Sequence, residues 1–244
     1  MTLLLLAGTG DGRRLAWGLV DIGLPVVVSL AGVTRMPEPL PLPLPSRVGG
    51  FGGEAGFVDY LEQAGITAVL DATHPFAARI TDRTARVCAA RGLPYLQILR
   101  PEWVPEPGDN WTMIGAEEEA ARHVRIGSTV FLATGRQTLD RFAGLLGCRV
   151  IVRQIDPPTA PFPFEGGEFL IGRPPFSVER EEGLFAQLGV DWIVVKNAGG
   201  EESRSKLIAA RNLGIPVLMI RRPPMPEAPR VQTVAQALDW VRRL

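Results

Sequence analysis

The chain has 244 residues, more than the roughly 100 to 150 of a typical domain, which predicts one large domain or two compact ones. Hydrophobic residues make up 46% and charged residues 21% at zero formal net charge, which excludes a disordered chain and argues against nucleic-acid partners. The two cysteines, Cys88 and Cys148, have no partner at metal-ligand spacing, which argues against a zinc site or a disulfide scaffold and predicts reduced, buried thiols.

The N-terminal leucine run has no basic residues before it and meets a glycine-rich turn directly, so it predicts a strand and not a signal peptide. The longest apolar stretch, residues 24–33, is about half of the ~20 residues that a spanning helix needs. We therefore expect a soluble, cytoplasmic protein that does not bind membranes.

Short apolar runs then alternate with segments of helical period, a pattern typical of a parallel sheet covered by helices. The strands predicted in the first half are residues 2–7, 25–31, 67–72 and 94–99, and the helices are 11–22, 54–64 and 76–91. Between them, residues 35–45 carry five prolines and predict an extended surface loop.

The pattern restarts after a proline-rich loop over residues 100–109. The strands predicted in the second half are 128–133, 148–154, 191–195 and 215–220, and the helices are 116–125, 137–146, 178–188, 203–213 and 233–243.

The second half also repeats the first. Residues 89–101 align with 209–223, and the turn GTGDGRRLA after Ala7 corresponds to TGRQTLDRF after Ala133. We expect an α/β protein of two Rossmann-like, doubly wound domains with largely parallel sheets, residues 1–109 and 110–244. A ligand would then bind in a cleft between them, at the carboxyl ends of the strands.

Gly8, Gly10 and Gly12 lie between the first strand and the first helix, where glycines let a phosphate approach a helix N-terminus. The spacing is GxGxG followed by Arg13, whereas the dinucleotide fingerprint is GxGxxG. A tight turn without a ligand is the alternative.

No acidic residue ends the second strand, where NAD-binding proteins hold the ribose hydroxyls. Thr34 and Arg35 follow instead, which favours the 2′-phosphate of NADP, with a solvated loop charge as the alternative for Arg35. The glycines of residues 49–53, Gly50 and Gly52 among them, offer a second exposed backbone loop or simple turn flexibility.

The third predicted strand ends in Asp71, Thr73 and His74. A histidine in a loop at the carboxyl end of a strand suits proton transfer, because its ordinary pKa of ~6.5 is close to neutrality. The other histidine, His123, lies in a charged segment and is expected on the surface.

In the second half, the corresponding strand ends carry polar and cationic residues. Lys196 ends an apolar strand, and because the sequence shows no partner for it, we expect a functional cation with Asn197 beside it. Arg136, Arg173 and Lys196 would form a cationic wall for a ligand with several carboxylates, although any of them could instead cap a helix or form a salt bridge.

Taken together, AGTGDGR, GGFGG, DATHPFA, LATGR, GRPPFS, KNAGG with Lys206 beyond it, and LGIPVLMIRRP resemble the precorrin-6A reductase family of cobalamin biosynthesis. The resemblance covers essentially the whole chain, and DATHPFA and KNAGG are its most specific parts. Family members often have Gly-Pro-Phe where this chain has Pro174-Pro175-Phe176.

The resemblance implies NADPH-dependent reduction of one double bond of precorrin-6A to give precorrin-6B. The cofactor-binding residues would be Gly8, Thr9, Gly10, Asp11, Gly12, Arg13, Arg35, Gly50, Gly52 and Thr73. The substrate-binding residues would be Thr134, Arg136, Arg173, Phe176, Lys196 and Asn197. His74 and Lys196 would be catalytic, with His74 or a water that it positions delivering the proton, and no metal would be needed.

Two alternatives remain: an NADPH-dependent reductase of another polycarboxylate, or a non-catalytic protein that binds NADPH or a tetrapyrrole. The expected partner is a tetrapyrrole-derived polycarboxylate, with possible hand-off of product to the next pathway enzyme. We expect a monomer.

Overall fold

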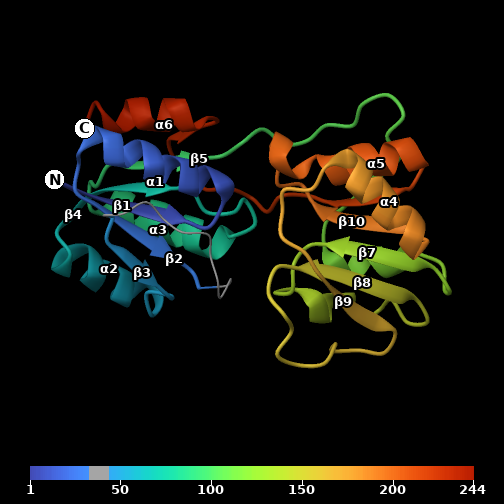
Figure 1. Ribbon diagram of the computed structural model, residues 1–244. Helices are drawn as coiled ribbons and strands as arrows, with labels where there is room; N and C mark the ends of the chain where they lie inside the picture. Colours follow the sequence, from blue (N-terminus) through green and yellow to red (C-terminus); the bar gives the residue numbers. More distant parts are fainter. Residues whose placement is uncertain (33–43) are drawn as a thin grey trace. The chain divides into compact units, whose positions relative to one another are not determined.

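The computed structural model describes residues 1–32 and 44–244, and the chain divides into two compact units (Figure 1). Unit 1 comprises Met1–Pro101 and Pro223–Leu244, and unit 2 comprises Glu102–Arg222. Each unit contains one six-stranded sheet, and every described strand pair is parallel. The predicted α/β class with two Rossmann-like domains is confirmed.

The sheet of unit 1 has the order β12-β5-β4-β1-β2-β3. Its strands are β1 (Thr2–Ala7), β2 (Val26–Leu30), β3 (Ser46–Val48), β4 (Ile66–Asp71), β5 (Tyr95–Ile98) and β12 (Arg230–Val231). Its helices are α1 (Gly10–Ile22), α2 (Gly53–Gln63), α3 (Ala78–Ala90) and α6 (Val234–Val241).

The sheet of unit 2 has the order β6-β11-β10-β7-β8-β9. Its strands are β6 (Trp111–Ile114), β7 (Thr129–Ala133), β8 (Arg149–Gln154), β9 (Gly167–Ile171), β10 (Trp192–Lys196) and β11 (Val217–Ile220). Its α-helices are α4 (Val178–Leu188) and α5 (Ser205–Leu213), and its 3₁₀ helices are η1 (Glu117–Arg122), η2 (Leu139–Phe142) and η3 (Glu201–Ser203).

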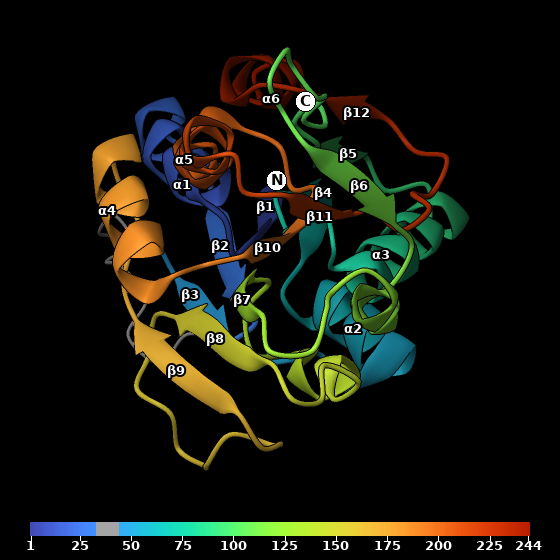
Figure 2. The same cartoon turned by 90° about the vertical axis from the view of Figure 1, so that its right-hand side faces the viewer.

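The two sheets match strand for strand, which confirms the internal repeat, but the halves exchange their last strands. After β5 the chain forms β6, which pairs with β11 of unit 2. After β11 it forms β12, which returns to pair with β5 of unit 1 (Figure 2). Each sheet is therefore completed by the strand that follows the last central strand of the other sheet in the chain.

This exchange corrects the expected ranges 1–109 and 110–244. Residues 223–244 belong to unit 1 because β12 extends its sheet and α6 packs on α1. A Cβ on Gly18 of α1 would lie 2.6 Å from Cδ1 of Leu238 in α6, so a glycine allows this close contact.

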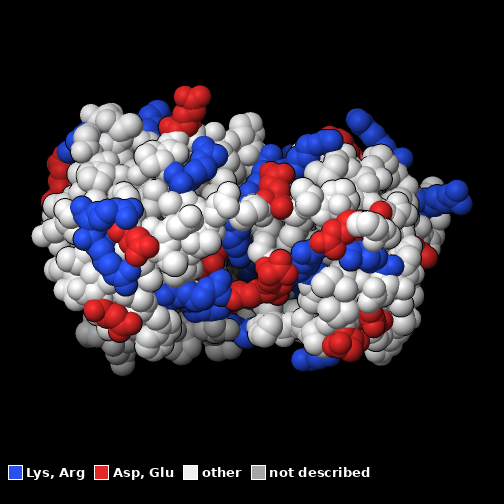
Figure 3. All heavy atoms as spheres, turned by 90° about the horizontal axis from the view of Figure 1, so that it is seen from above, with Lys and Arg blue, Asp and Glu red and all other residues white. Residues whose placement is uncertain are grey.

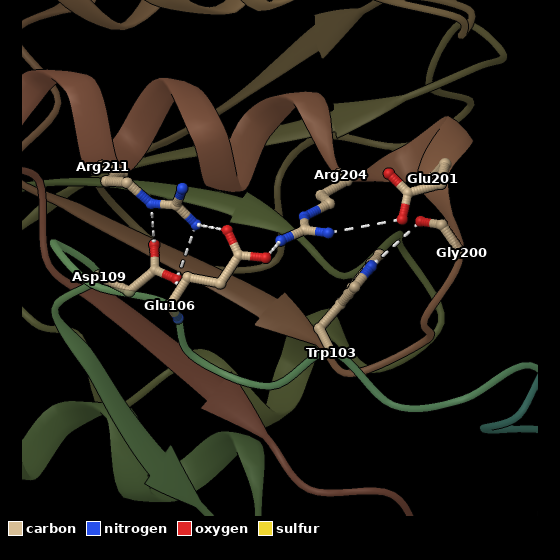
Figure 4. A network of polar contacts seen from close by, with 7 residues as sticks. All are labelled: Trp103, Glu106, Asp109, Gly200, Glu201, Arg204 and Arg211. Carbon is tan, nitrogen blue, oxygen red and sulfur yellow. Dashed lines mark hydrogen bonds and ion pairs between the residues drawn. The ribbon is translucent and has the colours of Figure 1, made fainter.

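Residues 102–109 belong to unit 2, where a network of charged side chains holds them (Figure 4). Arg211 of α5 contacts Asp109 at 2.8 Å and Glu106 at 2.9 Å. Arg204 also pairs with Glu106, and Nε1 of Trp103 donates to the carbonyl oxygen of Gly200 at 3.0 Å. The boundary thus lies near the start of the proline-rich loop, between Pro101 and Glu102, instead of at its end.

The leucine run of β1 is buried on both faces of its sheet, which explains its continuous apolar sequence. Leu3 and Leu5 pack with residues of α1 and α6, whereas Leu4 and Leu6 pack with residues of α2 and α3. Cys88 and Cys148 are buried and free, as predicted. Burial raises the pKa of Cys88 to about 12, so its thiol is inert.

Two predicted helices are shorter and tighter than expected. The segments 116–125 and 137–146 contain only the 3₁₀ helices η1 and η2. The expected loop over residues 35–45 lies outside the described residues except for its last two positions.

Acidic and basic side chains are interspersed on the face seen in Figure 3, in keeping with the zero net charge. Among the described residues, no helix has the length and apolar character needed to cross a membrane.

Candidate active site

Thr9 ties the turn between β1 and α1 to the end of β4. Its hydroxyl donates to the carbonyl oxygen of Ala72 (2.8 Å) and accepts from the N–H of Gly12 (3.1 Å), which makes Thr9 the N-cap of α1. A Cβ on Gly12 would lie 3.1 Å from the Cβ of Ala7, but one on Gly8 would meet nothing within 4 Å. Gly12 therefore lets α1 approach β1, while Gly8, at a φ of 151°, leaves open space before the helix.

Asp11 lies in the first turn of α1 with its charge paired. It is 7% exposed, and its carboxylate contacts Nη2 of Arg14 at 2.6 Å and Nε of Arg100 at 3.2 Å. Gly10 begins α1, and Arg13 is half-buried in the same turn. Backbone amides at a helix N-terminus, open space and an excess of guanidinium groups suit a phosphate ligand.

Arg47 of β3 occupies the space beside the end of β2. Its Nη1 donates to Oγ of Ser29 (2.8 Å) and to the carbonyl oxygen of Gly49 (3.0 Å), and its Nη2 donates to that of Gly50 (2.8 Å). Its guanidinium carbon lies 3.9 Å from the centre of the Phe51 ring. The end of β2 therefore carries a hydroxyl and a cation where an NAD-binding site would place a carboxylate.

Arg47 is not among the residues predicted from the sequence. Arg35, the predicted phosphate ligand, lies outside the described residues. The predicted glycines of the following loop have open space around them, since a Cβ on Gly50 or Gly52 would meet nothing within 4 Å. Gly52 has a φ of 76° and is the N-cap of α2, a conformation that favours glycine.

Asp71 fixes the loop that follows β4. It is fully buried, its Oδ1 accepts from the N–H of Thr73 (2.9 Å), and its Oδ2 accepts from the hydroxyl of Tyr95 (3.0 Å). Burial raises the pKa of Tyr95 and the Asp71 charge raises it further, so Tyr95 remains a neutral donor. The hydroxyls of Thr73 and Thr81 are 3.2 Å apart, which joins the loop to α3.

His74 is exposed at the end of this loop. Its Nδ1 accepts from the N–H of Phe76 at 3.2 Å. A neutral His74 in this arrangement carries its hydrogen on Nε2, which makes Nε2 the donor. His123, expected on the surface, is exposed.

Lys196, at the end of β10, has a partner that the sequence did not reveal. Its Nζ lies 3.5 Å from Oε1 of Glu117 and donates to Oγ1 of Thr138 at 3.2 Å. Glu117 is 5% exposed and also contacts Arg141 at 2.9 Å. Burial lowers the pKa of Lys196, and the Glu117 carboxylate opposes this effect. Glu117 and Thr138 could therefore give Lys196 a structural role, and its contact with substrate stays a prediction.

Asn197 is 1% exposed, and both polar ends of its side chain hold one backbone segment. Its Oδ1 accepts from the N–H of Trp103 (2.9 Å), and its Nδ2 donates to the carbonyl oxygen of Trp103 (3.0 Å). Asn197 thus anchors the start of unit 2, which is a structural role. Its predicted contact with substrate is not tested by this geometry.

The loop before α4 brings Phe176 against a buried ion pair. The ring centre of Phe176 lies 4.0 Å from Cζ of Arg153, and Arg153 makes two hydrogen bonds of 2.7 Å to Glu181. Arg173 is exposed in the same loop.

Lys206, in the first turn of α5, is 8% exposed. Its Nζ donates to the carbonyl oxygen of Ser203 and lies 5.6 Å from the ring centre of Trp103. Burial and the nearby Arg153 lower the pKa of Lys206 to about 8, and Glu181 opposes them.

Each unit gathers its predicted residues at the carboxyl ends of its own strands, the edge where open parallel sheets bind ligands. Unit 1 places there Gly8, Thr9, Gly10, Asp11, Gly12, Arg13, Gly50, Gly52, Thr73 and His74. Unit 2 places there Thr134, Arg136, Arg173, Phe176, Lys196 and Asn197. A hollow of about 540 Å³ lies at the opposite edge of unit 2, lined by residues 125–128, Asp191 and Trp192, and none of the predicted residues line it.

Comparisons with known proteins agree over the full length of the chain. A family model described as "Precorrin-6x reductase CbiJ/CobK" matches residues 2–242. A precorrin-6A reductase of Rhodococcus erythropolis is 44% identical over 246 residues, covering 99% of this chain and 98% of the relative. A precorrin-6A reductase of Rhodobacter capsulatus is 39% identical over 240 residues, covering 98% of this chain and 95% of the relative.

A solved structure described as "CobK precorrin-6A reductase" superposes with a TM-score of 0.93 at 38% identity, covering 100% of this chain and 96% of that one. A cobalt-precorrin-6A reductase of Priestia megaterium is more distant, at 28% identity over 232 residues, covering 91% of this chain and 90% of the relative.

Proposed function

We infer the function of this chain from its family, because the chain belongs to the precorrin-6x reductases CbiJ/CobK. It is an oxidoreductase of cobalamin biosynthesis that reduces a double bond of precorrin-6A to give precorrin-6B. The observation that carries this conclusion is the 44% identity to a precorrin-6A reductase over 99% of the chain.

We propose that the hydride donor is NADPH and that unit 1 binds it. The turn from Gly8 to Arg13 would hold its phosphates, since it combines open space at Gly8 with the N-terminus of α1. Arg47 beside Ser29 supports NADPH over NADH, because a guanidinium at the end of β2 suits a 2′-phosphate and the usual carboxylate is absent there.

When bound, the nicotinamide supplies the hydride, and the chain supplies orientation and a proton. His74 would deliver the proton from its Nε2, either directly or through a water that it holds. Nε2 is the donor because Nδ1 accepts from the N–H of Phe76. The substrate-binding residues would be those of unit 2, namely Thr134, Arg136, Arg173, Phe176, Lys196 and Asn197. A macrocycle with several carboxylates needs such cations.

We further propose that the substrate ring carries no cobalt. Relatives named precorrin-6A reductase are 37–44% identical to this chain. Relatives named cobalt-precorrin-6A reductase are only 27–29% identical.

The decisive experiment follows the loss of NADPH absorbance under anaerobic conditions with metal-free precorrin-6A. Parallel reactions use NADH in place of NADPH, and cobalt-loaded substrate in place of the metal-free ring. We expect rapid oxidation only with NADPH and the metal-free ring. Faster turnover with NADH or with the cobalt ring would overturn the corresponding proposal. Tight NADPH binding without oxidation by either ring would favour another polycarboxylate substrate or a non-catalytic binding protein.

A further inference from the structure

Three polar residues form a row along the carboxyl edge of the unit 2 sheet, and we call them the edge row: Lys196, Thr134 and Gln154. Lys196 and Gln154 end the strands β10 and β8, and Thr134 directly follows β7, which lies between those two strands (Figure 1). Val195 pairs with Ala133, so the next residues, Lys196 and Thr134, are neighbours when this register is extended by one residue. Leu132 pairs with Val152, so the same register extended by two residues places Thr134 beside Gln154.

Successive side chains of a strand alternate between faces, so Lys196 and Gln154 lie on one face of the sheet. Continuing this alternation one residue past the end of β7 places Thr134 on the same face. Phe131, Ile151 and Val195 belong to the core cluster that includes residues of α4 and α5. The edge row therefore faces the other way, toward η1 and η2. The contacts of Lys196 with Glu117 and Thr138 agree with this orientation.

Thr134 and Gln154 have buried polar atoms without a hydrogen-bond partner, as do Arg83, Thr84, Gln97 and Trp111 among the described residues, but Thr134 and Gln154 lie together at the carboxyl edge of one sheet. Thr134 is 9% exposed and Gln154 is 8% exposed, yet Oγ1 of Thr134 and both Oε1 and Nε2 of Gln154 are buried without a hydrogen-bond partner. Nearly all buried polar atoms in proteins have a partner, and an unsatisfied one is destabilising. Such atoms side by side at the edge that binds ligands indicate a site whose partner is not part of the chain.

We propose that Gln154 and Thr134 together bind one carboxylate arm of the substrate beside Lys196. This proposal rests on the proposed function, since it requires a polycarboxylate substrate at unit 2. The hydroxyl of Thr134 and the Nε2 of Gln154 donate to the two carboxylate oxygens, and Lys196 supplies positive charge next to them. Gln154 thereby becomes a specificity-determining residue, because neutral donors fix the position of a carboxylate that a flexible cation only attracts.

The competing occupant is a group that both donates and accepts, such as the carboxamide of the nicotinamide ring, because it would also use Oε1 of Gln154. Gln154→Glu separates the two. It keeps the shape of the side chain but replaces the donor with a negative charge, which repels a carboxylate and can still accept from a carboxamide.

The experiment measures KM for precorrin-6A, Kd for NADPH and the Tm of the ligand-free enzyme in Thr134→Val, Gln154→Met and Gln154→Glu. We expect KM for precorrin-6A to rise about tenfold or more in each variant and most in Gln154→Glu, with Kd for NADPH unchanged. The Tm of Thr134→Val and Gln154→Met should equal or exceed that of the wild type, because each removes polar atoms that lack a partner. Thr134→Ser keeps the hydroxyl that Thr134→Val removes, so its KM for precorrin-6A should lie close to the wild-type value.

Matched controls are Thr129→Val, at the other end of β7, and Gln187→Leu, exposed near the end of α4. Both should keep the wild-type KM. An unchanged KM in the Thr134 and Gln154 variants of an active enzyme would overturn the subsite while leaving the proposed function intact. A loss of NADPH affinity in place of substrate affinity would assign the pair to the cofactor. Absence of precorrin-6A turnover in the wild type would instead be a failure of the proposed function.

Discussion

The two lysines of unit 2, the half-buried Lys196 and the buried Lys206, lie in opposite electrostatic settings. Lys196 has the Glu117 carboxylate 3.5 Å away, whereas Lys206 has the cation Arg153 nearby and shares Glu181 with it. Removing the lysine charge should therefore change the free energy of unfolding in opposite directions at the two positions.

Replacing Lys196 with Met leaves the buried Glu117 with Arg141 as its one cationic contact among residues 1–32 and 44–244, and should lower the free energy of unfolding by about 1 to 3 kcal/mol. It should also raise KM for precorrin-6A. In the double variant Lys196→Met/Glu117→Gln, denaturant unfolding should show recovered stability while KM stays high. If KM recovers together with stability, Lys196 has a structural role only.

Lys206 should make stability depend on pH in the alkaline range. Its pKa is lowered by burial from the ordinary 10.5 to about 8, so between these values the unfolded chain binds more protons than the folded one, and stability rises with pH. Relative to Lys206→Met, the wild type should gain about 3 kcal/mol across this window. Urea unfolding of both proteins at several pH values measures the difference, and a difference that does not change with pH would contradict the expectation.

The sequence identifies Lys196 as unusual but cannot show its partner, because Glu117 comes from a distant segment of the chain. Likewise Thr134 is predicted from its place after a strand, whereas Gln154 is not, since it is distinguished only by the missing hydrogen bonds of its amide. Properties that depend on through-space neighbours are not visible in one sequence.

At the scale of elements, the central strands are predictable and the edge strands are not. The strands that the sequence analysis missed are β3, β6, β9 and β12, which are the two edge strands of each sheet. An edge strand has only one neighbouring strand and stays partly exposed, as the residues of β3 and β9 do, so it lacks the continuous apolar run of β1 or β10.

The helix η1 is short because little of it is buried. Residues 116–125 contain good helix formers, but their buried positions are only Glu117 and Ala120. One buried turn does not stabilise a full α-helix, because most helical stability comes from packing an apolar face.

The start of α1 depends on one hydroxyl, which gives a prediction for this element. Thr9→Val removes both the cap on Gly12 and the bond to Ala72, and should cost about 1 to 2 kcal/mol of stability and weaken NADPH binding. Thr9→Ser keeps the hydroxyl and should behave like the wild type. Thermal unfolding and NADPH titration measure both effects, and equal losses in the two variants would refute the role of the hydroxyl.

For the whole molecule, the exchanged last strands mean that unit 1 is discontinuous in sequence while unit 2 is continuous. Both termini belong to unit 1 and lie close to each other in Figures 1 and 2. A flexible linker can therefore join Leu244 to Met1 without rearranging the sheet.

A circular permutant that carries this linker and opens between Pro101 and Glu102 makes each unit a single segment. We expect it to fold and to bind NADPH with wild-type affinity, because every strand pair is kept. The matched comparison is a chain truncated after Arg222, which lacks β12 and α6 and should lose NADPH binding. Circular dichroism and NADPH titration report folding and binding. A folded permutant that cannot bind NADPH would show that the connection at Pro101 itself is needed.

The exchange also sets the order in which the protein takes shape during translation. Domains generally fold as units as they leave the ribosome, the N-terminal one first. Here the second domain is complete once Arg222 has emerged, while the first sheet still has an open edge at β5 that waits for β12. Unit 1, which we propose binds the cofactor, is therefore begun first and finished last, and its sheet is complete only when β12 has been made.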